Sequence, residues 1–153
     1  MYEAVITLCL MATAGLCRDQ LVPGYEAPML EVCAAALIER PPEIDIGLGL
    51  EAKAAPFCKA AGEALVVTEV APGVFVHMGD VAEPDMRNRG DATNLGFVMG
   101  ESSIAVIDTG TARWMGEALW RAIRARSDLP VSHVVLTHMH PDHVLGAAAF
   151  SGT

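Results

Sequence analysis

The sequence predicts an α/β fold, on the strength of two observations. Residues 104–107 and 131–137 are apolar, β-branched runs typical of strands, and a helical pattern lies between them. A strand, a helix and a strand in this spacing form a βαβ unit whose strands run parallel with a right-handed crossover. The chain is also 52% hydrophobic but only 5% aromatic, which favours layered α/β packing over an aromatic-rich sandwich.

The helix of this unit is expected to begin at Thr111 as its N-cap and to end near residues 127–130. Its apolar positions recur with helical spacing at Met115, Leu119, Ala122 and Ile123. Its charged positions are expected to face water: Arg113, Glu117, Arg121 and Arg124.

Short β-rich runs precede the βαβ unit. Residues 65–70 and 74–77 are two such runs, separated by the turn Ala71-Pro72-Gly73. Residues 78–93 are polar and contain Gly and Pro, so they are expected to form a loop. Residues 95–99 then pair with residues 104–107 as a hairpin. These strands and the βαβ unit are therefore expected to form one domain that spans residues 64–153.

Residues 1–63 have a different composition and form a separate segment. They contain all the cysteines: Cys9, Cys17, Cys33 and Cys58. An even number in one segment predicts up to two disulfides, with three possible connectivities, and an oxidising compartment. The alternative is four small buried side chains in a reduced protein. No Cys-x-x-Cys pair is present, which argues against a thiolate zinc site.

The N-terminal segment also contains two patterns of secondary structure. Residues 26–39 predict a helix that Pro41 and Pro42 stop, whereas residues 44–55 predict nothing definite. Residues 4–16 have the length of a signal-peptide apolar region but lack a positive flank, so a buried strand or helix start is the alternative. The run is too short to span a bilayer.

The formal net charge of −9 is spread along the chain. A dispersed acidic charge is typical of a solvated surface. No basic stripe is present, so the sequence gives no support for nucleic-acid binding.

The candidate metal ligands lie directly after residues 131–137. Three of the chain's five histidines fall there within six residues: His138, His140 and His143. In an extended segment, His138 and His140 point the same way and can reach one metal ion. Pro141 suits the first turn of a helix, which would turn Asp142 and His143 toward a second position nearby. Imidazole and carboxylate are ligands for zinc, iron or manganese.

Asp108 ends the neighbouring parallel strand, at the same sheet edge. It is expected either to orient a ligand histidine or to cap the turn before the helix, and the two roles are compatible. His77 and His133 stand alone on strand runs and are expected to be structural.

The motif His138-x-His140-x-Asp142-His143 resembles the signature of the metallo-β-lactamase fold superfamily. Residues 70–76, 94–97 and 107–110 resemble its opening strands, hairpin and turn. The shorter stretch Asn88-Arg89-Gly90-Asp91 is similar to quinoprotein relay system zinc metallohydrolases. That narrower resemblance implies a periplasmic enzyme, with a cytoplasmic location as the alternative.

The superfamily resemblance implies an αββα sandwich with a dinuclear zinc site. His138 and His140 would bind the first ion, and Asp142 and His143 the second. A metal-activated hydroxide, oriented by Asp142, would attack a carbonyl or phosphoryl centre of a small-molecule substrate.

The chain departs from the family pattern after His143. The family's remaining ligands, two histidines and a bridging aspartate, have no counterpart in residues 144–153. We therefore expect the N-terminal half of a sandwich, inactive alone, which a missing C-terminal half or a partner chain would complete. Two alternatives remain: a mononuclear iron oxygenase of the same fold acting on thiol or persulfide substrates, and a non-catalytic metal-binding module.

Overall fold

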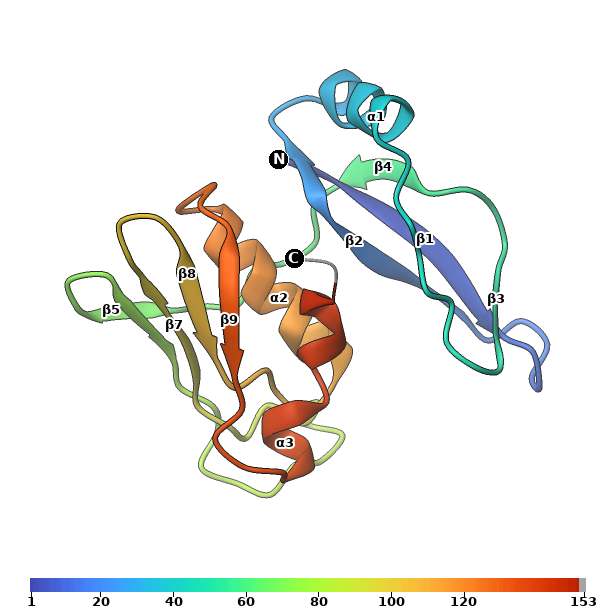
Figure 1. Ribbon diagram of the computed structural model, residues 1–153. Helices are drawn as coiled ribbons and strands as arrows, with labels where there is room; N and C mark the ends of the chain where they lie inside the picture. Colours follow the sequence, from blue (N-terminus) through green and yellow to red (C-terminus); the bar gives the residue numbers. More distant parts are fainter. Residues whose placement is uncertain (152–153) are drawn as a thin grey trace. The chain divides into compact units, whose positions relative to one another are not determined.

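A computed structural model describes residues 1–151 of the chain, which divides into two compact units, residues 1–61 (unit 1) and 62–153 (unit 2). Both units combine a β-sheet with helices (Figure 1). The α/β prediction is therefore confirmed. Among residues 1–151, no helix combines the length and the apolarity needed to cross a membrane.

Unit 1 is a small antiparallel sheet with one helix. The central strand β1 (Tyr2–Leu10) pairs with β2 (Cys17–Ala27) on one side, and with β3 (Leu50–Ala52) and β4 (Phe57–Ala60) on the other. Alternate residues of β1 face the helix α1 (Leu30–Glu39), because side chains alternate between the faces of a strand. The core of the unit comprises Ala4, Ile6, Leu8, Val22, Tyr25, Ala27 and Cys33.

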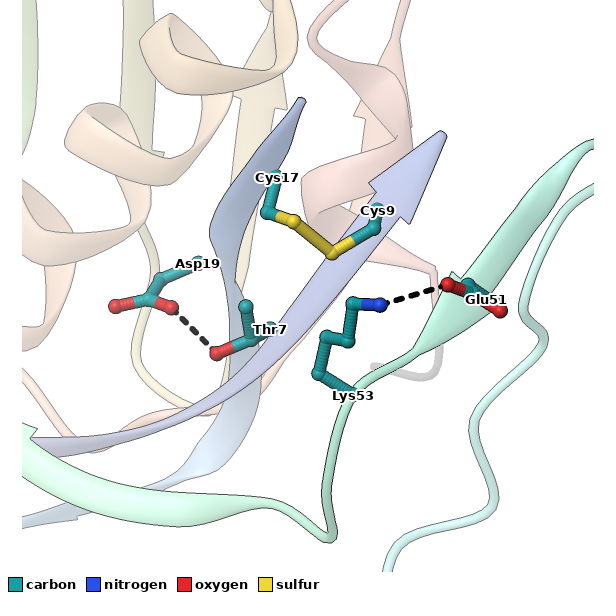
Figure 2. The surroundings of a disulfide bond; sticks show 6 residues. All are labelled: Thr7, Cys9, Cys17, Asp19, Glu51 and Lys53. Atoms are coloured by element: carbon teal, nitrogen blue, oxygen red, sulfur yellow. Dashed lines mark hydrogen bonds and ion pairs between the residues drawn. A yellow bond between two sulfur atoms is a disulfide. The ribbon is translucent and has the colours of Figure 1, made fainter. Parts of the chain in front are cut away.

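Two disulfides cross-link unit 1, as the cysteine count predicts. Cys9–Cys17 joins β1 to β2 across their hairpin, and Cys33–Cys58 joins α1 to β4. Figure 2 shows the first bridge beside two surface contacts, a 2.8 Å hydrogen bond from Thr7 to Asp19 and a 2.9 Å ion pair of Lys53 with Glu51. Residues 1–151 contain no free cysteine.

Three local features of unit 1 differ from the sequence predictions or resolve them. The helix begins at Leu30 rather than Glu26, because Glu26 still belongs to β2, which continues to Ala27. Strand β1 occupies most of the apolar N-terminal run, so the strand alternative describes its structure. The unassigned stretch 44–55 contains the short strand β3.

Unit 2 contains a mixed five-stranded sheet in the order β5-β6-β7-β8-β9. The first four strands are antiparallel neighbours, whereas β9 runs parallel to β8, as the βαβ prediction requires. Four strands lie within or at the predicted runs: β6 Val74–His77, β7 Leu95–Met99, β8 Ile104–Ile107 and β9 Val131–Val135. The strand β5 (Thr68–Ala71) begins three residues later than predicted and includes Ala71, which was expected in the turn. Residues 78–93 form the predicted loop.

Helix α2 (Arg113–Arg124) connects β8 to β9, and its predicted apolar stripe is fully buried. Two expectations about it are wrong. Ala112, not Thr111, is the N-cap, because the Thr111 hydroxyl donates to the carbonyl of Gly90 instead. Glu117 is buried rather than solvated, and Arg113, one turn earlier, pairs with it at 3.0 Å.

The C-terminal helices dock against α2 and the end of β8 through glycine. These helices are α3 (Pro141–Val144) and the 3₁₀ helix η1 (Ala147–Phe150). A Cβ added at Gly116 of α2 would lie 2.2 Å from the carbonyl oxygen of Gly146, and one at Gly146 would lie 1.9 Å from that of Thr109. Only glycine permits such backbone contact. This packing fixes α3 beside Asp108 and Thr109.

Candidate metal centre

The predicted site residues lie where β8 and β9 end. Asp108 directly follows β8, and residues 136–140 lead from β9 into α3, with Pro141 as its first residue (Figure 1). Pro141 has no N–H and a fixed φ, so it is suited to that position. Because β8 and β9 are parallel, their carboxyl ends meet at one sheet edge.

Asp108 is the buried centre of a hydrogen-bond network. Its side chain is 5% exposed, and its backbone has a left-handed φ of 54°, which a non-glycine residue adopts only at some cost. Oδ1 accepts the backbone N–H of Thr137 at 2.8 Å. Oδ2 accepts both the Thr137 hydroxyl at 2.7 Å and Nδ1–H of His143 at 2.8 Å.

These contacts keep Asp108 ionised. Burial by itself would raise the pKa of the Asp108 carboxyl. The hydrogen bonds from the Thr137 backbone, His143 and the Thr137 hydroxyl outweigh burial and hold that pKa below its ordinary value of 3.8.

An ionised Asp108 determines which nitrogens carry protons in two histidines. A carboxylate only accepts hydrogen bonds, so Nδ1 of His143 donates a proton to it, and Nε2 is the ring nitrogen that a metal ion could bind. The Thr137 hydroxyl donates its only proton to Asp108. It can therefore only accept in its 3.0 Å contact with Nδ1 of His138, so that nitrogen carries a proton. Nε2 of His138 is thereby also left as the nitrogen that a metal ion could bind. In both rings a hydrogen bond holds Nδ1 and Nε2 faces another of the candidate ligands, which is the arrangement of a histidine that binds a metal ion through Nε2.

The four predicted ligands form two facing pairs. Nε2 of His138 lies 3.1 Å from Nδ1 of His140, and Nε2 of His143 lies 3.3 Å from Oδ2 of Asp142. Two ligands of a tetrahedral zinc ion stand about 3.3 Å apart, given bonds of about 2.0–2.1 Å. The rings of His138 and His143 are 4.0 Å apart and connect the pairs. The donor types and the spacing within each pair therefore fit zinc.

Each pair supplies only part of a coordination sphere. Within residues 1–151, no three His, Cys, Asp or Glu side chains surround a common point as a metal cluster. His138 and His140 are exposed, and Asp142 and His143 are partly buried. A groove of about 410 Å³ adjoins the second pair, lined by loop residues 79–82 and 92–94 with Asp142 and His143.

Thr93 is a member of the site that the sequence analysis missed. This buried residue of the loop donates its hydroxyl to Oδ2 of Asp142 at 2.6 Å. That hydrogen bond is the largest cause holding the pKa of the Asp142 carboxyl below its ordinary value. The two residues are 49 positions apart, and no local pattern marks Thr93. Thr137, by contrast, stands next to His138 at a strand end, where its role could have been anticipated.

The other histidines lie outside this cluster. His77 is buried and uses both ring nitrogens, at 2.8 Å from the Val66 carbonyl and at 2.8 Å from Oδ1 of Asp91. His133 is exposed on β9 and contacts the Ser132 hydroxyl. Neither has a hydrogen bond with a candidate metal ligand. The structural roles expected for them stay predictions.

Replacing Thr93 by valine is expected to raise the pKa of Asp142 toward its ordinary value and to weaken zinc binding by about tenfold. Valine keeps the volume but removes the hydroxyl that orients and stabilises the carboxylate. Carboxyl NMR titration measures the pKa of the metal-free protein, and calorimetry measures zinc affinity. Thr93→Ser keeps the hydroxyl, so the pKa of Asp142 and the zinc affinity of this variant should equal those of the parent chain. Equal behaviour of the valine and serine variants would show that the hydroxyl has no such role.

Comparisons with known proteins show which family the second part of the chain resembles. A model of the metallo-beta-lactamase superfamily matches residues 88–153, which include Asp108 and all four ligand candidates. No curated protein matches the chain. Among solved structures, the chain is similar to TMB-1, with 26% identity, a TM-score of 0.45, and coverage of 58% of this chain and 39% of the TMB-1 chain. The chain thus spans well under half of the TMB-1 chain. From residue 88 onward, the chain is therefore similar to the metallo-beta-lactamase superfamily.

Proposed function

We propose that this chain contributes the first half of a dinuclear zinc centre in a metal-dependent hydrolase. The observation that carries the proposal is the pair of facing donor sets, His138 with His140 and Asp142 with His143, at 3.1 Å and 3.3 Å. Zinc in such a site supplies a nucleophile near neutral pH by lowering the pKa of a bound water.

The chain's own residues would prepare this site. Asp108 orients His143 directly and His138 through Thr137, and Thr93 orients Asp142. Preorganised ligands lose less conformational freedom when a metal binds. The adjoining groove of about 410 Å³ is in the size range of small-molecule sites, which supports a small-molecule substrate.

Zinc titration of the metal-free chain by calorimetry tests the proposal. We expect binding that His138→Ala weakens more than about tenfold, because removing a ligand costs more than removing a supporting residue. His133→Ala, an exposed histidine on β9 outside the cluster, is the matched control and should bind zinc normally. Equal affinity of the two variants would refute the site. Iron in protein purified from native cells would overturn the choice of zinc.

The 153-residue chain by itself is expected to show almost no hydrolase activity, even with zinc. Each ion gains only two ligands from it, and no third donor stands within reach in residues 1–151. Clear zinc-dependent hydrolysis of ester substrates by a chain of verified mass would contradict this expectation.

We further propose an oxidising compartment, such as a periplasm, as the location. The two disulfides of unit 1 support it, because cytosolic reductants keep thiols reduced. Alkylation in intact native cells tests the proposal, since a cytoplasmic chain would be labelled at its four cysteines.

A further inference from the structure

A second pocket of unit 2 has no role in the metal centre. Its volume is about 330 Å³, and it shares no lining residue with the groove beside Asp142 and His143. Its walls come from residues 63–66, from the end of β6 and the loop after it, and from one face of α2. A volume of this size suits a small organic ligand.

Arg89 is an exposed residue at the rim of this pocket. Its guanidinium stacks on the indole of Trp114, with 4.4 Å from the guanidinium carbon to the ring centroid. Within residues 1–151, that guanidinium makes no hydrogen bond or ion pair with a protein group. Its backbone has a φ of 54°, in the left-handed region. The loop thus holds a planar cation with its N–H donors available, at a conformational cost.

Arg121 adds a second positive charge to the wall. It projects from α2 two turns after Trp114. Its guanidinium carbon lies 2.9 Å from the position that a Cβ of residue 62 would occupy, so Gly62 leaves room for it.

Two acidic residues, Glu63 and Asp91, also line the pocket. Nδ1 of His77 faces the Val66 carbonyl, and Nε2 faces Asp91 at 2.8 Å. The Asp91 carboxylate is thus already engaged by the ring of His77. Glu63 is exposed. The remaining lining is aliphatic, from Ala64, Leu65, Val66 and Ala118. The pocket therefore places the guanidinium of Arg89 beside an apolar wall.

We propose that this pocket binds a small carboxylate that has an apolar body. The carboxylate would accept two parallel hydrogen bonds from the guanidinium of Arg89, which is a geometry that planar arginine provides. The aliphatic wall would receive the body of the ligand. A single negative charge suits the site better than a dianionic phosphate does, because Glu63 also lines it.

Calorimetric titration of the full chain with benzoate tests the proposal. We expect millimolar binding, with benzamide, the uncharged analogue, and inorganic phosphate both at least about tenfold weaker, since a charge-assisted pair is lost or mismatched. Arg89→Gln should weaken benzoate binding by about tenfold or more, and Arg89→Lys by less. The indole N–H resonance of Trp114 should shift as benzoate binds.

Two controls locate the binding. Arg87→Gln removes a neighbouring loop arginine that pairs with Asp85 at 2.8 Å and does not line the pocket, so it should bind benzoate normally. His138→Ala should also bind normally, which excludes binding at the metal centre. Absence of benzoate binding at millimolar concentration, equal binding by the Arg89→Gln variant, or phosphate binding as tight as that of benzoate would each overturn the proposal.

Discussion

Replacing Asp108 by alanine is expected to weaken zinc binding by about 10- to 100-fold and to lower the free energy of unfolding of unit 2 by about 2–3 kcal/mol. The carboxylate accepts three hydrogen bonds, from the Thr137 backbone, the Thr137 hydroxyl and His143. Alanine would leave buried donors without an acceptor and would free both His138 and His143 to adopt other tautomers and orientations. Calorimetry with zinc and urea unfolding of the metal-free chain measure the two effects.

The controls for this variant separate charge from hydrogen bonding. Asp128→Ala removes an exposed carboxylate elsewhere in unit 2 and should change neither quantity appreciably. Asp108→Asn keeps one acceptor oxygen in place of the two that the three donors need, so its losses should be smaller than those of alanine. Zinc affinity unchanged in the alanine variant would mean that Asp108 does not support the ligands.

The contribution of Asp108 to stability can also be measured through the pH dependence of unfolding. Because its pKa is lowered in the folded protein, its ionised form stabilises the fold above the unperturbed value of 3.8, and this stabilisation is lost as the pH falls through the folded pKa. Asp108→Asn should therefore lose less stability than the parent chain between neutral pH and strongly acidic pH.

The site could be predicted from the sequence where its geometry is local. His138 and His140 face one another because alternate residues of an extended segment do so, and Pro141 starts α3 as expected. Asp108 was placed correctly because parallel strands end at a common edge. These inferences need only backbone periodicity and strand direction.

Other features depend on contacts that no local pattern encodes. Thr93 reaches Asp142 only because the loop after β6 folds back over the sheet edge. Glu117 has the helical phase of a solvated residue, yet it is buried and paired with the partly buried Arg113. The start of α1 shifted because β2 continues through Glu26, where pairing across the sheet overrides helical propensity. The cysteine count allowed three pairings, and only the fold selects one.

Removing the Cys33–Cys58 disulfide, by replacing both residues with alanine, is expected to destabilise unit 1 by about 3.5 kcal/mol. This bridge closes a loop with a sequence separation of 25, so its loss greatly increases the entropy of the unfolded chain. Cys33 is also completely buried in the core, so a packing loss adds to the effect. Cys9–Cys17 has a separation of only 8, and its double alanine variant should lose less, about 2.5 kcal/mol.

The aromatic residues allow each unit to be followed separately in one urea titration. Both tyrosines lie in unit 1, where Tyr25 is buried and donates its hydroxyl to the Arg40 carbonyl, whereas both tryptophans lie in unit 2. The tyrosine near-ultraviolet circular dichroism should shift to lower urea in the Cys33→Ala, Cys58→Ala variant, and tryptophan fluorescence should not. A larger loss from the Cys9–Cys17 variant would contradict the loop-entropy explanation. A shift confined to tryptophan would show that the bridge does not stabilise the unit that contains it.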